Sequence, residues 1–166
     1  MQLKYLRNIL PTQESLDKIC AIAWSPNNLK LAVCASDRVV QLFDEFGERK
    51  DKFPTKPVDA KVVNLFLFGK KSYVIRGLAF SPDSTKIAVG QSDNIVFVYK
   101  VGEEWGEKKV ICNKFPLQSS VTCIAWPLEG PIIVGLADGK VRAAHTRNNR
   151  SQTLYSTDSL VISLAV

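Results

Sequence analysis

Short apolar segments, separated by turn-forming residues, follow one another along most of the chain. One segment runs from Ile19 to Trp24, the pair Ser25 and Pro26 comes next, and a second segment covers Leu29–Cys34. Proline fixes φ and lacks an N–H donor, so a Ser-Pro pair favours a turn. Apolar segments this short, bounded by turn residues, indicate β-strands rather than helices.

This pattern is an internal repeat. Residues 19–43 and 75–99 align over 25 positions without a gap, at an offset of 56 residues, and ten positions are identical. A third copy starts at Val121 and resumes at Ile132–Val141, one residue shorter. Repeats of this size are typical of folds that stack one small supersecondary unit several times.

Each copy has a second turn, built on an aspartate, that leads into a third strand. We expect each aspartate to cap its own turn through its side chain. A looser fourth strand is predicted in each copy, at Arg49–Phe53, Lys109–Phe115 and Gln152–Ser156. The aromatic and turn positions that shape the repeat are expected to be structural residues: Trp24, Ser25, Pro26, Asp37, Phe80, Ser81, Pro82, Asp93, Trp126, Asp138 and Gly139.

Four short strands per copy, at a spacing of about 40–45 residues, describe a β-propeller blade. Phe80 and Trp126 are 46 residues apart, and the longer spacing of 56 between Trp24 and Phe80 reflects an insertion between the first two copies. We therefore predict an all-β fold, an incomplete propeller of about three four-stranded blades plus the first strand of a fourth. A β-sandwich also has many short strands, but it does not account for the matching turns. The predicted units are a latch strand (1–17), blade 1 (18–56), an inter-blade insertion (57–73), blade 2 (74–116), blade 3 (117–157) and the start of blade 4 (158–166).

Three blades alone would leave two sheet faces uncovered. Propellers typically have about 4–8 blades, so we expect this chain to be the front part of a longer propeller, in which residues 1–17 help to close the ring. The uncovered faces would exceed the few hundred Å² of apolar patch found on most monomers. We expect poor solubility unless a partner or a second copy covers them.

Val62–Phe68 interrupts the repeat between blades 1 and 2 with seven mostly apolar residues. Loops normally run over the surface, and an uncharged, β-prone segment there is an aggregation risk. Two interpretations stay open. The segment is either the product of an alternative splice boundary or retained intron sequence, or an extra strand that pairs with the edge of blade 1.

The net charge of +6, from 22 basic and 16 acidic residues, weakly favours an acidic partner. The basic residues are spread in small groups, which argues against a surface for nucleic acid or acidic lipid. The longest apolar stretch has seven residues, whereas a spanning helix needs about 20. No secretory signal is evident, so the expected compartment is cytosolic. The aromatic residues fall at expected blade-core positions: Trp24, Phe43, Phe80, Tyr99 and Trp126.

Candidate catalytic chemistry is sparse. Cys20, Cys34, Cys112 and Cys123 have no paired spacing, which indicates buried free thiols rather than a zinc site. A catalytic triad or a Cys–His pair would need His145, the single histidine, and no nucleophile motif lies near it. Glycine-rich phosphate loops are absent from the sequence. We expect no enzyme activity and no catalytic, cofactor-binding or metal-binding residues.

The turns resemble those of WD repeats, in degenerate form. Ser25-Pro26-Asn27, Ser81-Pro82-Asp83 and the three turn aspartates fit that family. The usual Gly-His before each blade is absent, and the closing Trp-Asp is replaced by Phe43-Asp44, Tyr99-Lys100 and Ala144-His145. The resemblance implies a WD40-type propeller in which the family's buried Asp-His-Ser/Thr-Trp network cannot form in full.

Longer stretches are similar to the WD-repeat subunits of intraflagellar transport, over nearly the whole chain: Met1–Lys4, Cys34–Val40, Asp44–Arg49, Phe80–Ala88, Val110–Phe115 and Gly135–Arg142. This resemblance implies a non-enzymatic scaffold of the intraflagellar transport B complex, acting in cilium assembly and maintenance. Its implied partners are other transport subunits, and its implied location is the cilium (axoneme and basal body region) and the cytoplasm. A generic WD-repeat adaptor and a non-functional truncated splice product are the alternatives, and partner-binding residues stay unassigned.

Overall fold

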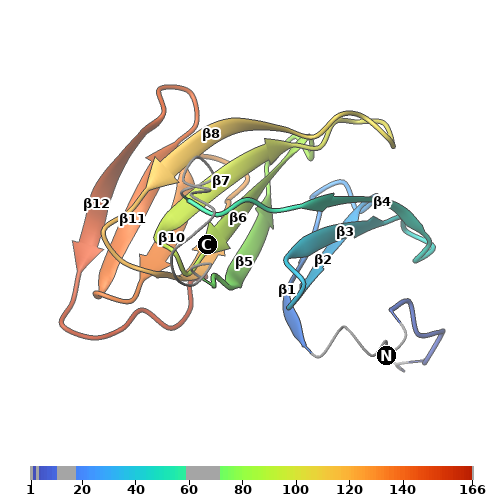
Figure 1. Ribbon diagram of the computed structural model, residues 1–166, viewed down its shortest axis with the longest axis horizontal. Helices are drawn as coiled ribbons and strands as arrows, with labels where there is room; N and C mark the ends of the chain where they lie inside the picture. Colours follow the sequence, from blue (N-terminus) through green and yellow to red (C-terminus); the bar gives the residue numbers. More distant parts are fainter. Residues whose placement is uncertain (1, 3, 11–17, 59–71, 166) are drawn as a thin grey trace, which may run out of the picture.

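A computed structural model describes residues 2, 4–10, 18–58 and 72–165. Its strands form three sheets of four antiparallel strands each (Figure 1). Blade 1 contains β1 (Ile19–Trp24), β2 (Leu31–Ala35), β3 (Val39–Phe43) and β4 (Arg49–Pro54). Blade 2 contains β5 (Ile75–Phe80), β6 (Lys86–Gln91), β7 (Ile95–Lys100) and β8 (Val110–Pro116). Blade 3 contains β9 (Val121–Ala125), β10 (Ile132–Leu136), β11 (Lys140–His145) and β12 (Arg150–Ser156).

Within each blade, every strand pairs with the next one in the chain, so each blade is a simple meander. The first strands lie together, with β1 beside β5 and β5 beside β9, and the three sheets fan out from them (Figure 1). This is the geometry of neighbouring propeller blades. The predicted all-β class and the predicted number of four-stranded blades are confirmed.

The strand register repeats from blade to blade, irregularities included. Pairing of the first two strands slips at the start of each blade, next to Ile19, Ile75 and Val121. A β-bulge re-aims side chains and is usually retained as a feature of the fold. The shared register makes residues of different blades equivalent, so that one blade can be compared with another position by position.

The core lies between the sheets and not within any one of them. In β7, Ile95, Phe97 and Tyr99 join the cluster between blades 1 and 2, whereas Val96 and Val98 join the cluster between blades 2 and 3. All five side chains are buried. A sheet covered on both faces needs apolar residues at every position, which explains why these strands do not alternate with polar residues.

Within the described residues, blades 1 and 3 each have one face that no other blade covers. Trp24 is 51% exposed and Ile22 is 64% exposed, whereas their equivalents Phe80 and Leu78 are 3% and 7% exposed. The prediction that Trp24 is a core residue is therefore wrong for this chain, because no sheet in the described residues covers that face of β1. On blade 3, Tyr155 is exposed, whereas its equivalent in blade 1, Phe53, is buried.

Residues 4–10 and 158–165 form no strand in the described structure. The N–H of Val161 donates to the carbonyl of Leu136 at 3.4 Å. Val161 also packs closely against Gly135, because a Cβ added to Gly135 would lie 2.6 Å from Val161 Cγ1. The latch strand and the first strand of blade 4 stay predictions. The rest of the latch and the Val62–Phe68 insertion lie outside the described residues.

The cysteines are free thiols, but they are not all buried. Cys34 is fully buried, and burial raises the pKa of its thiol to about 12. A thiol with such a pKa is unreactive at neutral pH. Cys112 is exposed on β8, so the prediction of burial is wrong for this residue.

Candidate functional site

The Ser-Pro turns of blades 1 and 2 are built in the same way. The Ser25 hydroxyl accepts the N–H of Lys30 at 2.9 Å and donates to Asn27 at 2.7 Å, and Ser81 makes the same two bonds within its own turn. The N–H of Asn27 also donates to the hydroxyl of Ser84 at 3.2 Å, across the two blades. These turns therefore fix the strand ends and help to join adjacent blades.

The three turn aspartates do not all act alike. Asp37 and Asp138 each accept the N–H two residues ahead, at 3.1 and 3.2 Å. The expectation that Asp93 caps its own turn is wrong, because its carboxylate accepts the N–H of Val58 at 2.9 Å. Asp93 thus holds the segment that leaves blade 1 against blade 2.

The residue after each aspartate has a positive φ: 63° at Arg38, 66° at Asn94 and 85° at Gly139. Non-glycine residues rarely adopt this left-handed conformation. Glycine is required in blade 3, because a Cβ on Gly139 would collide with the carbonyl oxygen of Thr157. The three positions are therefore turn positions, as the sequence pattern indicates.

The contact between blades 1 and 2, here called the first junction, is filled by aromatic side chains. The rings of Phe53 and Tyr99 lie 4.9 Å apart between centroids, and both are buried. The hydroxyl of Tyr73 lies 2.9 Å from Thr55 Oγ1, and the hydroxyl of Tyr99 accepts the N–H of Lys56 at 3.2 Å. Burial raises the pKa of Tyr99 to about 12, so the phenol stays neutral at physiological pH.

A buried lysine also crosses the first junction. Lys30 Nζ, at the start of β2, donates to the carbonyl oxygens of Gly102 and Glu103 in the β7–β8 loop, both at 2.7 Å. It lies 5.2 Å from the centroid of the Trp105 ring. Burial, followed by repulsion from Lys109, lowers the pKa of Lys30. Its equivalent in blade 2, Lys86, pairs with Asp83 of its own turn, at 3.9 Å from Nζ to Oδ2.

The same loop is bound a second time, from β4. Asp51 accepts Lys109 Nζ at 2.5 Å and the N–H of Gly106 at 3.2 Å. Burial alone would raise the pKa of Asp51, but the hydrogen bonds from Lys109 and from backbone N–H groups lower it overall. The first junction therefore combines aromatic packing with two charged contacts to one loop.

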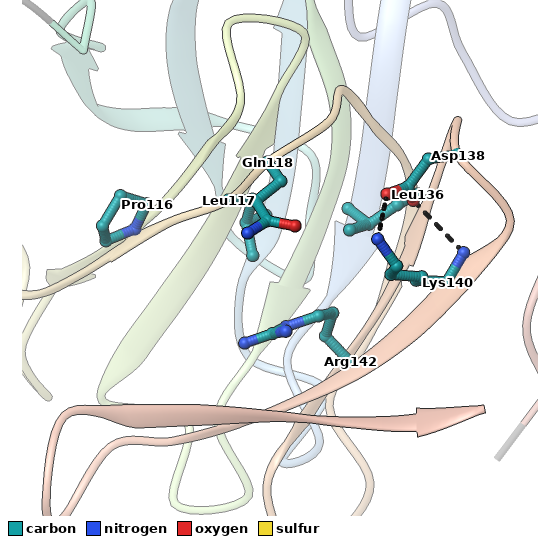
Figure 2. Close-up of a pocket in the computed structure, with 7 residues that line it drawn as sticks. All are labelled: Pro116, Leu117, Gln118, Leu136, Asp138, Lys140 and Arg142. Carbon is teal, nitrogen blue, oxygen red and sulfur yellow. Dashed lines mark hydrogen bonds and ion pairs between the residues drawn. The ribbon is translucent and has the colours of Figure 1, made fainter. Parts of the chain in front are cut away.

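The contact between blades 2 and 3, here called the second junction, has different chemistry. Asn113 takes the place of Asp51, and its amide donates to the carbonyl of Thr146 at 2.9 Å. A cavity of about 130 Å³ lies at this junction (Figure 2). Its lining consists of Pro116, Leu117, Gln118, Leu136, Asp138, Lys140 and Arg142.

Sequence reasoning missed the residues that matter at the junctions. Lys30 directly precedes β2, Asp51 lies in β4 and Arg142 lies in β11. The partners of the Lys30 and Asp51 side chains are distant in sequence, and those of Arg142 lie outside the turn motifs. A residue-by-residue alignment of the third copy gives one usable signal. Arg142 stands where Phe97 stands in blade 2, and such an exchange of an aromatic residue for a cation marks an altered junction.

The described residues offer little for catalysis. They contain no group of three His, Cys, Asp or Glu side chains placed to hold a metal ion. His145 ends β11 opposite Arg150. The described part of the chain also contains no helix that could cross a membrane.

Comparison with known proteins agrees with this architecture. The WD domain, G-beta repeat, matches residues 7–44 and 62–100. Among solved structures, the crystal structure of RRP9 WD40 repeats superposes with a TM-score of 0.70, covering 92% of this chain and 42% of that one. The sequence identity is 17%, so this similarity supports the fold alone.

Much higher sequence identity is found with transport proteins. The chain is 59% identical over 164 residues to the intraflagellar transport protein 172 homolog of Rattus norvegicus. It is 61% identical over 165 residues to the homolog of Drosophila melanogaster. Each match covers 99% of this chain but 9% of the relative. The chain therefore spans a small part of the length of these relatives.

Proposed function

We propose that this chain, a member of the WD40-repeat propeller family, is a non-enzymatic scaffold module of the intraflagellar transport B complex. The observation that carries the proposal is the identity of about 60% to intraflagellar transport protein 172 homologues, which runs through all three blades. Its partners would be other transport subunits. Its place would be the cilium, at the axoneme and basal body, and the cytoplasm, and its role would be cilium assembly and maintenance.

The physical build of the chain suits a scaffold. Strands are buried between neighbouring blades, and turns and loops occupy both ends of each sheet. Loops carried on a rigid frame are the usual place for protein contacts. The wild-type frame should therefore be needed for binding, and damage to it should abolish binding.

Affinity capture from ciliated cells tests this proposal. The tagged 166-residue chain is expressed and its partners are identified by mass spectrometry. We expect intraflagellar transport subunits to be enriched over a Val89→Asp variant, which places a charge at a fully buried position of blade 2. Recovery of chaperones alone by a wild-type chain, or of no transport subunit by a folded one, would contradict the proposal.

A further inference from the structure

The cavity at the second junction has the size of one side chain. Its volume is about 130 Å³, well above the roughly 10–15 Å³ that a cavity needs to hold one water molecule. Leu117 and Leu136 supply apolar surface, and Lys140 and Arg142 supply positive charge. Figure 2 shows the Arg142 guanidinium extending below Leu117 and Gln118, with Lys140 beside Asp138.

The cavity exists because blade 3 lacks the aromatic residues that fill the first junction. By strand register, Arg142 is equivalent to Phe97 and Ala144 is equivalent to Tyr99. Phe97 and Tyr99 are 2% and 3% exposed. Because a cation and a small residue stand where blade 2 has these two aromatic rings, the second junction contains a cavity whose lining is positively charged on the side of blade 3.

Arg142 is held in place by neutral groups only. Its Nη1 donates to Thr153 Oγ1 at 3.0 Å, and its Nη2 donates to the Ser151 carbonyl at 3.0 Å and the Ser151 hydroxyl at 2.7 Å. Its Nε is buried and has no partner among the described residues. No carboxylate in the described part of the chain forms an ion pair with it. The guanidinium is therefore fixed but its charge is not neutralised.

The second cation is already paired. Lys140 Nζ lies 2.9 Å from Asp138 Oδ2, and this hydrogen bond lowers the pKa of Asp138. Asp138 therefore stays ionised and competes with any incoming anion. Its other oxygen accepts the N–H of Lys140 in the turn, a bond that an asparagine could keep without the charge.

We propose that this cavity binds a glutamate or aspartate side chain of a partner protein, with Arg142 as the main cationic contact and Lys140 as the second. A guanidinium recognises a planar carboxylate through paired N–H donors. The leucines suit the aliphatic stem of such a side chain, and the net charge of +6 favours an acidic partner. The inference rests on the proposed function in one respect: the carboxylate that binds in the cavity belongs to a protein partner of the scaffold.

A defined peptide tests the site on the purified 166-residue chain. Fluorescein-labelled hexaglutamate is the probe, hexaglutamine is the neutral control, and fluorescence anisotropy reports binding. We expect hexaglutamate to bind and Arg142→Gln to weaken it about tenfold or more, as for the loss of a charge-assisted hydrogen bond. Arg147→Gln is the matched control, because Arg147 is exposed in the same blade and carries the same charge.

Asp138→Asn gives a test in the opposite direction. It keeps the turn hydrogen bond and frees Lys140, so hexaglutamate should bind several-fold more tightly. A residue with a merely structural role would give no gain in affinity. If Arg142→Gln fails to fold, the affinity of the Asp138→Asn variant for hexaglutamate still tests the inference.

Three results would overturn the inference. They are equal weakening by Arg142→Gln and Arg147→Gln, no gain from Asp138→Asn, and displacement of hexaglutamate by inorganic phosphate at concentrations where acetate has no effect. The last result would assign the cavity to a phosphate group instead. If hexaglutamate does not bind the wild-type chain, but the Arg142→Gln variant still captures transport subunits from cells, the assignment of the cavity fails and the scaffold function stands.

Discussion

The two junctions join equivalent surfaces of successive blades, yet they are filled differently. The first junction buries Phe53, Tyr73 and Tyr99 and adds the charged contacts of Lys30 and Asp51. The second buries one aromatic ring, Phe115, among smaller aliphatic side chains and leaves a cavity. The backbone repeat therefore sets only the spacing of the blades. The side chains determine whether a junction is fully packed or contains a cavity.

The aromatic packing of the first junction should be its strongest element. Phe53→Ala should lower the free energy of unfolding by about 3–5 kcal/mol, as for other buried aromatic truncations. Tyr155→Ala is the matched control, because Tyr155 occupies the equivalent position but is 63% exposed, and its effect should stay within about 0.5 kcal/mol. Urea unfolding followed by tryptophan fluorescence measures both. Equal effects would mean that Phe53 and Tyr155 do not differ in burial.

The buried ammonium should contribute the next largest effect. Lys30→Met keeps the aliphatic stem but leaves two carbonyl oxygens without their donor, and should cost about 1–3 kcal/mol. Lys86→Met is the control, since Lys86 Nζ is 3.9 Å from Asp83 at a partly exposed site, and should cost about 0.5 kcal/mol or less. The measurement is the same urea titration. A larger loss for Lys86→Met would contradict the assignment of Lys30 as the cross-blade contact.

The first junction should also be sensitive to acid. The pKa of Asp51 is lowered in the folded chain, so the unfolded chain binds the proton first and the stability from the Lys109 contact is lost as the pH falls below about 4. Asp51→Asn should flatten the fall of unfolding free energy between pH 5 and pH 3. Asp158→Asn, a change at an exposed residue, should not. Identical pH profiles for the wild type and Asp51→Asn would refute this prediction.

The smallest effect concerns Gln91, the first-junction equivalent of Leu136. Gln91 is fully buried, and neither of its amide atoms has a partner within the described residues. Gln91→Leu should therefore raise the free energy of unfolding by about 1 kcal/mol. Gln41→Leu is the control, because the side-chain oxygen Oε1 of Gln41 accepts a hydrogen bond from Arg49. This substitution should not raise the free energy of unfolding. Destabilisation by Gln91→Leu would show that the amide has a partner.

The sequence was sufficient to predict strands, turns and blades, since repetition amplifies each weak local signal. Ser25 and Ser81 lie in matching turns, and local chemistry determines both. Whether the Trp24 side chain is buried depends on whether another sheet covers β1, and no local sequence pattern reveals this. Asp93 and Lys30 bind groups 35 and 72 residues away along the chain. Such contacts depend on how blades meet, and a repeat pattern cannot rank equivalent positions by their neighbours.

The covering of each outer strand by the following blade also has a consequence in time. Phe53 is synthesised 46 residues before Tyr99, the ring that packs against it. Ribosomes add about 5–20 residues per second, so the first blade waits for some seconds with its aromatic face open to water. During that interval the nascent chain presents a surface that chaperones can hold, and the arrival of β7 is the event that ends their access.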